Sequence, residues 1–382
     1  MKKFIALTAV LGLYCTFGAK KAYAWSSATH EDIVSKALKL LEKEKKTRQS
    51  AFFRNYHSQI LKGCTEPDNE DDPDCGLGSH YYSAYNPKGK ELSQVNGYYQ
   101  NRLGKFARSA RTMLEENYTS ALSLYKNGNI ETAMRFLGRS AHFISDMGCT
   151  VHATNMRYLP KPGNVHYAFE KHVSTTCVKQ TAENLDKRLT KFYSKDDFQE
   201  ACNRFVKYSG KFGDAISSLD PLTFDKVSSN TLPATQQNVA SLFLKFYDDC
   251  NSEKSNYLKD RKLYTIKNQA SGLALTASPK GLTLETPDKS PAQKFEVCLL
   301  ENGTFSIKTN DGKFIRSDLK GYDSADKIAR PSVFRAAALG QKVFRIHSVS
   351  SKSEKALTNT KSGKLTFTDF DPSVPTQQWL FL

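Results

Sequence analysis

The sequence predicts two folded domains, an all-α domain followed by an all-β domain. The chain has 382 residues, which is room for two ordinary domains. Apolar residues recur at helical spacing up to about residue 257; beyond it they fall in short β-branched and aromatic runs between Gly-containing turns. A composition of 39% apolar and 25% charged residues excludes a disordered or fibrous chain. After the first 20 residues, no apolar run approaches the 18 residues that a membrane span needs.

The first 24 residues are expected to be a secretory signal peptide. Lys2 and Lys3 give a basic start, residues 4–18 are mostly apolar, and the Ala-Tyr-Ala sequence at 22–24 is a typical cleavage site. We therefore expect a secreted or periplasmic protein whose mature chain begins at Trp25.

Secretion permits disulfides. Removing the signal peptide removes one of the eight cysteines and leaves seven, so at least one is unpaired within the monomer. Cys64 and Cys75 bracket an acidic loop and are the best local pair. The remaining pairing stays open.

Residues 25–257 are predicted to be helical. A capping-box-like start at Thr29 and Asp32 precedes apolar residues at helical spacing. Residues 106–114, 130–145 and 239–247 repeat that spacing, and prolines fall between such segments.

Residues 258–382 are predicted to form strands that repeat. Runs such as residues 263–266, 305–307 and 365–368 alternate with Ser-Gly, Asn-Gly and Asp-Gly turns. The segments around Phe295, Phe344 and Trp379 are alike. This part resembles the ricin-type β-trefoil, whose lobes each end in Gln-x-Trp or Gln-x-Phe. Gln293 and Gln377 fit that signature, whereas Gln341 stands one residue too early.

The positive charge is unevenly placed. Lys and Arg number 55 and Asp and Glu 39, which gives +16. Residues 261–382 hold 19 basic and 11 acidic side chains, or +8, and the signal peptide holds +4. A basic β domain suits an anionic lipid or other polyanionic surface. The alternative is that these charges only keep the surface of the β domain well solvated.

The most chemically specific segment lies between residues 139 and 170. His142 and Asp146 are four residues apart, so on a helix they share one face and can grip one ion. His152 follows six residues later, and His166 with Glu170 repeats the four-residue spacing. Because imidazole and carboxylate are ligands of zinc in hydrolytic sites, this segment predicts a zinc centre.

With groups earlier in the chain, these positions resemble the bacterial zinc-dependent phospholipase C family, which includes the α-toxins. Mature members of that family begin with a Trp that binds zinc through its amino group and carbonyl. They then place an Asp in a Pro-Asp loop and a His about a dozen residues later. The resemblance fills nine positions in order: Trp25, His30, Asp68, His80, His142, Asp146, His152, His166 and Glu170.

The resemblance implies three zinc ions. One would take Asp68, His80, His142 and Asp146, a second His152, His166 and Glu170, and a third Trp25, His30 and the shared Asp146. Cations on the oxygens of a phosphodiester neutralise charge that develops in the transition state, and they generate a nucleophile from water. Asp68 could also act as a general base, although a role as ligand only is the alternative.

The expected activity is hydrolysis of a membrane glycerophospholipid to diacylglycerol and a phosphorylated headgroup. The expected partners are a phospholipid membrane surface and a glycan on the trefoil; we expect a monomer and no nucleic-acid partner. Two alternatives remain. One is a secreted single-strand-specific zinc nuclease, which the short step from Trp25 to His30 favours, whereas Glu170 and the Ala-Thr-Asn sequence after His152 favour a phospholipase. The other is a catalytically inactive lectin-like protein.

The headgroup stays open. Choline-preferring phospholipases carry an acid three residues after the N-terminal Trp and aromatic residues near the loop Asp and His. The matching positions here are Ala28, Asn69 and Leu77, so no choline site is evident. Three tyrosines could replace those aromatic residues: Tyr81, Tyr82 and Tyr85. The alternative is that they pack in the hydrophobic core.

Overall fold

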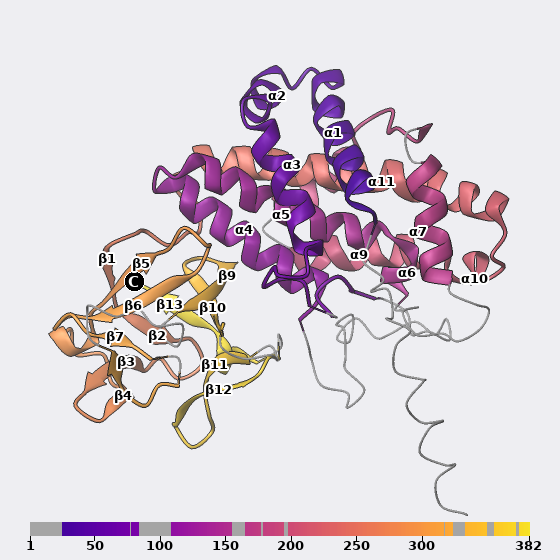
Figure 1. Ribbon diagram of the computed structural model, residues 1–382. Coiled ribbons are helices and arrows are strands. Elements are labelled where there is room, and N and C mark those ends of the chain that lie inside the picture. Colours follow the sequence, from indigo (N-terminus) through magenta and orange to yellow (C-terminus); the bar gives the residue numbers. More distant parts are fainter. Residues whose placement is uncertain are drawn as a thin grey trace, which may run out of the picture.

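The computed structural model places the helices first and the strands last (Figure 1). It describes residues 25–76, 78–83, 108–154, 165–176, 179–194, 198–316, 318–323, 333–349, 355–371 and 374–382. The predicted signal peptide lies outside the described residues. So do Tyr85, Leu77 and Cys177. No helix within the described ranges is long and apolar enough to cross a membrane.

The helices are α1 (Ser27–Lys43), α2 (Thr47–Arg54), α3 (His57–Thr65), α4 (Ala110–Lys126), α5 (Ile130–Gly148), α6 (Thr150–Ala153), α7 (Val165–Thr176), α8 (Lys187–Ser194), α9 (Phe198–Gly210), α10 (Gly213–Ile216) and α11 (Pro221–Asn251). The strands are β1 (Lys262–Tyr264), β2 (Ile266–Asn268), β3 (Ala274–Ser278), β4 (Gly281–Glu285), β5 (Phe295–Leu299), β6 (Phe305–Thr309), β7 (Phe314–Ile315), β8 (Tyr322–Asp323), β9 (Phe334–Gly340), β10 (Val343–Ser348), β11 (Lys355–Asn359), β12 (Leu365–Asp369) and β13 (Trp379–Phe381).

The buried hydrophobic side chains form two clusters, one between Trp25 and Cys250 and the other between Leu258 and Phe381. The all-α and all-β fold class is therefore confirmed. The predicted domain boundary at 257–258 falls between α11 and β1 and stays a prediction.

The start of α1 differs from the sequence prediction. The side chain of Ser26, and not that of Thr29, caps the helix by accepting the backbone N–H of Thr29. An oxygen acceptor at this position satisfies an N–H that has no partner within the helix. The turn that follows brings His30 onto the buried face of α1.

Two glycines bring α3 directly against α5. A Cβ on Gly63 would lie 1.9 Å from the carbonyl oxygen of Arg135, and a Cβ on Gly138 would lie 2.1 Å from that of Ile60. Because neither residue has a side chain, the two backbones come closer together than any larger residue would allow. The chain that leaves α3 therefore passes beside the middle of α5, where His142 lies.

The strands form a β-trefoil: a six-stranded antiparallel barrel with three hairpins. Strands β1 and β2 are halves of one strand, and they pair with β5 and β13 respectively; the ladder then continues through β6, β9 and β10 and closes the barrel. The three hairpins are β3–β4, β7–β8 and β11–β12.

The Gln signature recurs structurally in two of the three lobes. Gln293 accepts the backbone N–H of Asp288, and its amide donates to the Thr286 carbonyl; Gln377 does the same with the residues at 371 and 369. The repeat suggested at Phe344 was wrong in register. Gln341 lies in the turn between β9 and β10 with a left-handed φ of 49°, and Phe344 belongs to β10, which opens the third lobe.

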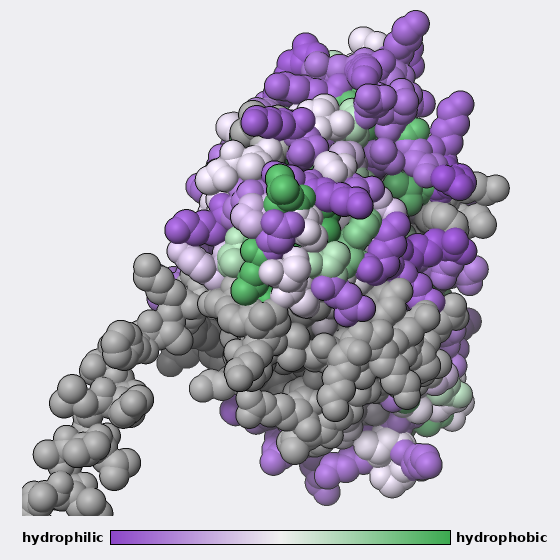
Figure 2. Space-filling model, turned by 90° about the vertical axis from the view of Figure 1, so that its right-hand side faces the viewer, coloured by the Kyte–Doolittle hydropathy of each residue, from purple (hydrophilic) through white to green (hydrophobic). Residues whose placement is uncertain are grey.

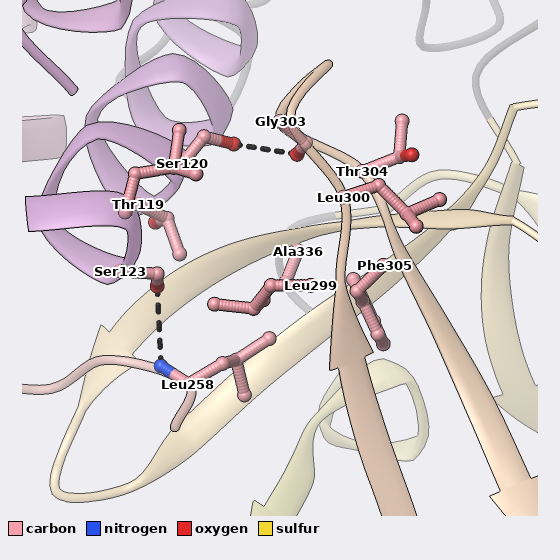
Figure 3. A pocket seen from close by; sticks show the side chains of 11 residues that line it. Thr119, Ser120, Ser123, Leu258, Leu299, Leu300, Gly303, Thr304, Phe305 and Ala336 are labelled. Atoms are coloured by element: carbon pink, nitrogen blue, oxygen red, sulfur yellow. Dashed lines mark hydrogen bonds between the residues drawn. The ribbon is translucent and has the colours of Figure 1, made fainter. Parts of the chain in front are cut away.

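The two domains pack on each other through α4, which contacts strand β9 and the turn between β5 and β6 (Figure 3). The Ser120 hydroxyl donates to the carbonyl of Gly303 at 2.8 Å, and the Leu258 N–H donates to the Ser123 hydroxyl at 3.1 Å. The space left between these residues is about 10 Å³, which holds at most one water molecule. The contact is therefore closely packed.

Candidate metal centre

Helix α5 carries the first His/Asp pair on its buried face. His142 and Asp146 are both fully buried, and α5 ends at Gly148. A Cβ on Gly148 would lie 2.0 Å from the Thr235 hydroxyl, so the helix end is pressed against α11. The chain then turns into α6, which carries His152.

The first group of ligand candidates surrounds the carboxylate of Asp146. One oxygen, Oδ2, lies 2.9 Å from Nδ1 of His80 and 3.3 Å from Nε2 of His142. The other oxygen, Oδ1, lies 3.6 Å from Nε2 of His30. The two oxygens thus face different imidazoles, which is the arrangement of a carboxylate that bridges two ions.

Asp68 completes the first group. Its carboxylate oxygens lie 3.8 Å from Nε2 of His30, 3.9 Å from Nδ1 of His80 and 3.8 Å from Nε2 of His142. Asp68 is partly exposed, whereas Asp146 is fully buried.

The second group lies at the junction of α6 and α7. Oε1 of Glu170 is 2.7 Å from Nε2 of His166 and 3.2 Å from Nε2 of His152. The Cys149 thiol is buried beside them, 3.8 Å from the same oxygen. Tyr81 stacks on the ring of His152 and places its hydroxyl 3.2 Å from Nδ1 of His166.

Backbone carbonyls fix the orientation of two imidazoles. Nδ1 of His142 lies 2.8 Å from the Cys64 carbonyl, and Nδ1 of His152 lies 2.7 Å from the His80 carbonyl. A carbonyl can only accept, so each Nδ1 carries the proton and each Nε2 presents its lone pair to its group. Hydrogen bonding of the second ring nitrogen is typical of histidines that bind metals.

Ser145 orients His30 in the same way and also holds Trp25. The Ser145 hydroxyl donates to carbonyls of the preceding turn, so it accepts from Nδ1 of His30 at 3.0 Å and leaves Nε2 free to bind. The indole N–H of Trp25 donates to the Ser145 carbonyl at 2.9 Å. Trp25 and His30 therefore both lie beside Asp146.

Buried atoms without partners mark the first group as a cation site. Nε2 of His30, Oδ1 of Asp68 and Oδ1 of Asp146 are buried and make no hydrogen bond within the described part of the chain. Such atoms cost about 1–3 kcal/mol each when nothing satisfies them. Since all three are electron-pair donors, a divalent cation would satisfy them together, and the N/O donor set fits zinc.

Burial and mutual contact shift several pKa values. Burial alone would raise the pKa of the Asp146 carboxyl, but His142 and His80 outweigh burial and leave that pKa well below its usual range. Against its own burial, His80 has its pKa raised to about 10 by Asp146. Burial and the neighbouring His142 lower the pKa of His30. For Glu170, His166 overcomes burial and lowers the pKa.

Sequence reasoning missed a charged network behind the loop that carries Asp68 and His80. Arg139, one turn before His142 in α5, binds Asp72 at 2.6 Å, Asp74 at 2.7 Å and Glu66 at 3.1 Å. All three acids lie in the acidic loop between Cys64 and Cys75, and nothing in the sequence of that loop indicates a buried partner. The network fixes the middle of the loop to the helix that presents the first group.

The headgroup candidates fall into separate environments. Ala28 and Asn69 are exposed. Tyr82 is core, with its hydroxyl donating to the side chain of Asn203. Tyr81 alone among the described tyrosines of this segment lies against the second group.

The predicted disulfide between Cys64 and Cys75 is wrong. Both are free thiols in the structure. Cys64 lies inside α3, where its thiol donates to the Leu61 carbonyl, and Cys75 contacts the Asp68 carbonyl. Each sulfur is therefore held by its own local backbone.

Comparison with known proteins shows what the helical part is similar to. Residues 29–211 match the family model "Zinc dependent phospholipase C". The phospholipase C of Paraclostridium bifermentans is 25% identical over 179 residues, which are 44% of this chain and 44% of that protein. That of Clostridium perfringens is 26% identical over 164 residues, 38% of this chain and 39% of that protein.

A solved structure extends the likeness in fold. Alpha toxin from Clostridium absonum covers 85% of this chain and 87% of its own at 17% identity, with a TM-score of 0.51. The chain spans about half the length of the curated relatives it matches. The family match therefore confirms that residues 29–211 resemble the zinc-dependent phospholipase C family, and the solved structure shows a similar fold.

Proposed function

We propose that the protein is a secreted zinc-dependent phospholipase C. It would hydrolyse the phosphodiester of membrane glycerophospholipids to diacylglycerol and a phosphorylated headgroup. The observation that carries the proposal is the pair of buried His/carboxylate groups, one of them centred on an Asp146 whose two oxygens face different histidines. The family of the helical domain supports the same reaction.

Three zinc ions are the proposed complement. The sets are Asp68, His80, His142 and Asp146 for the first, His152, His166 and Glu170 for the second, and Trp25, His30 and Asp146 for the third. The two oxygens of Asp146 face different histidines, and the indole N–H of Trp25 donates to the carbonyl of Ser145, the residue before Asp146. Both contacts support a carboxylate of Asp146 that is shared by the first and third ions.

The third set requires that residues 1–24 be removed. Cleavage after Ala24 would give Trp25 a free α-amine, which an amide in the uncleaved chain cannot replace as a ligand. The burial of the Trp25 side chain beside Ser145 supports this role, since it holds the start of the mature chain next to His30 and Asp146.

The chain's own residues supply position and proton transfer. Bound zinc would contribute Lewis acidity toward the phosphate oxygens and toward water. Asp68, which is partly exposed, is the proposed general base. Asp146 is fully buried, and its proposed role is only to bind zinc. Tyr81 fixes the ring of His152 by stacking and the ring of His166 through its hydroxyl.

The surface of the helical domain supports contact with a lipid surface. Tyr167, which follows His166, is 46% exposed, and Leu222 in the first turn of α11 is 77% exposed. Lys171 lies beside the Tyr167 ring. Figure 2 shows hydrophobic side chains exposed among hydrophilic ones on the face of the molecule that it draws. Aromatic residues flanked by cations suit the interface between headgroups and acyl chains.

The trefoil is proposed to target the enzyme to a surface glycan or membrane. Its net charge of +8 favours an anionic surface. A cavity of about 390 Å³ is lined by Asp311, Lys313 and Tyr322 together with small residues of the β3–β4 hairpin and of the segment before β5. The Tyr322 hydroxyl is bonded to the carbonyls of Ser278 and Gly281, so its ring is held rigidly at the cavity wall.

The experiment that tests the proposal offers zinc-loaded mature protein a panel of phospholipid vesicles and, separately, single-stranded nucleic acid. Release of diacylglycerol from vesicles is the expected result, and the headgroup panel identifies the preferred lipid. Hydrolysis of nucleic acid without release of diacylglycerol would establish the nuclease alternative instead. Absence of both activities in a protein with full zinc content would favour an inactive binding protein.

A further inference from the structure

The trefoil reaches the loop between the two metal-ligand candidates Asp68 and His80. Arg335 in β9 forms an ion pair with the fully buried carboxylate of Asp74, and its guanidinium also lies 3.6 Å from Glu116. Asp74 stands six residues after Asp68 and six before His80. A β-domain side chain therefore holds the centre of this loop, which we call the ligand loop (residues 66–80).

The pair fixes the ligand loop against the helix that carries the other ligands. Asp74 uses its second carboxylate oxygen to bind Arg139 of α5 at 2.7 Å, and the Asn117 amide donates to the same oxygen. Its backbone carbonyl accepts the hydroxyl of Ser79, the neighbour of His80, at 2.6 Å. Asp74 thus transmits its position to His80 through one residue.

We propose that Arg335 is a positioning residue of the metal centre, so that docking of the trefoil sets the geometry with which Asp68 and His80 meet the zinc. The inference rests on the proposed metal centre. It assigns the β domain a part in building that centre as well as in targeting. Because coupling between sites is reciprocal, zinc binding also strengthens the docking of the trefoil.

The geometry allows Arg335 to be removed without leaving a buried charge alone. Asp74 keeps Arg139, and Arg108 lies 3.5 Å from it; Glu116 also keeps Arg108, at 3.4 Å. Arg335→Gln should therefore fold. The substitution removes only one of the contacts that hold the ligand loop. We therefore expect zinc affinity to fall about tenfold, which is the lower end of the loss seen when residues bonded to metal ligands are altered.

The test measures zinc affinity by chelator competition on the full mature chain, together with the visible spectrum of the Co²⁺-substituted protein. Arg335→Gln should weaken zinc about tenfold and change the Co²⁺ spectrum. Arg335→Lys, which keeps a cation for Asp74, should recover most of the affinity. Ser120→Ala is the matched control, since it removes an interdomain hydrogen bond to Gly303 outside the ligand loop; it should bind zinc as the wild type does.

Two results would overturn the inference. One is wild-type zinc affinity and an unchanged Co²⁺ spectrum in Arg335→Gln. The other is an equal loss in Ser120→Ala, which would assign the effect to domain packing in general. Failure of the wild-type protein to bind zinc would instead remove the metal centre itself, so the two failures are distinguishable.

Discussion

Replacing Asp146 by Asn tests the shared carboxylate at the middle of the first group. The substitution keeps the shape of the side chain but removes its charge and turns one oxygen into an NH₂ that cannot accept. Oδ1 faces His30 at 3.6 Å, while Oδ2 faces His80 at 2.9 Å and His142 at 3.3 Å. Whichever way the amide is oriented, one side of the centre loses its oxygen ligand.

The expected loss is large. Altering residues that only hydrogen-bond to metal ligands already costs 10–100-fold in affinity. Loss of a ligand itself should therefore weaken at least one ion by about 100-fold or more, or about 2.7 kcal/mol. Because both neighbouring ions depend on this carboxylate, turnover should fall to background.

The assay pairs zinc stoichiometry by elemental analysis with release of diacylglycerol from vesicles. Asp71→Asn is the control, because Asp71 is an exposed acid of the same loop. We expect Asp146→Asn to lose zinc and activity together while Asp71→Asn keeps both. Full zinc content and normal turnover in Asp146→Asn would refute the reasoning.

Three further predictions follow from the same contacts. A protein that retains Ala24 before Trp25 should bind one zinc ion at least about tenfold more weakly, since an amide replaces the α-amine; equal affinities by chelator competition would refute N-terminal ligation. Gly303→Ala should lower the thermal unfolding midpoint more than Gly363→Ala does: both have φ near +73°, but only a Cβ on Gly303 meets the Phe136 ring, at 2.4 Å. Arg335, Arg139 and Arg108 together overcome burial and hold the pKa of Asp74 well below its usual range. Ionised Asp74 therefore stabilises the fold above about pH 4 and ceases to do so as the pH falls toward that lowered pKa. Asp74→Asn should lower the free energy of unfolding by about 3 kcal/mol at pH 7 and by less near pH 3. Denaturant unfolding at the two pH values measures both losses, and equal losses would contradict this prediction.

Part of the candidate site follows from local spacing along the sequence. His142 with Asp146, and His166 with Glu170, are one helical turn apart, so helix geometry alone puts each pair on one face. That Asp68 comes to meet His142 depends on Gly63 and Gly138, which let α3 lie against α5. No pattern of apolar residues reports such a backbone contact.

The parts that failed depend on choices between similar local patterns. Ser26 and Thr29 are both good caps, and only the entry of the chain into α1 decides between them. Gln341 stands near a Phe as the trefoil signature requires, yet it occupies a turn whose left-handed φ a repeat motif cannot reveal. Cys64 and Cys75 are close in sequence, but each thiol finds a backbone carbonyl.

The ion pair between Arg335 and Asp74 illustrates what sequence alone cannot give. The two residues are 261 positions apart and belong to different domains. Asp74 lies in an acidic loop, and Arg335 is a single charge in an otherwise apolar segment, so neither position indicates its partner. Only the packing of the trefoil on α4 brings them together.

The most direct test of the account is a count of zinc in protein that begins at Trp25. We expect three zinc ions per chain, and we expect the count to fall when His142 or His166 is replaced by Ala. A correctly processed, folded protein that binds no zinc would contradict the proposal that these two groups of buried side chains are a catalytic metal centre.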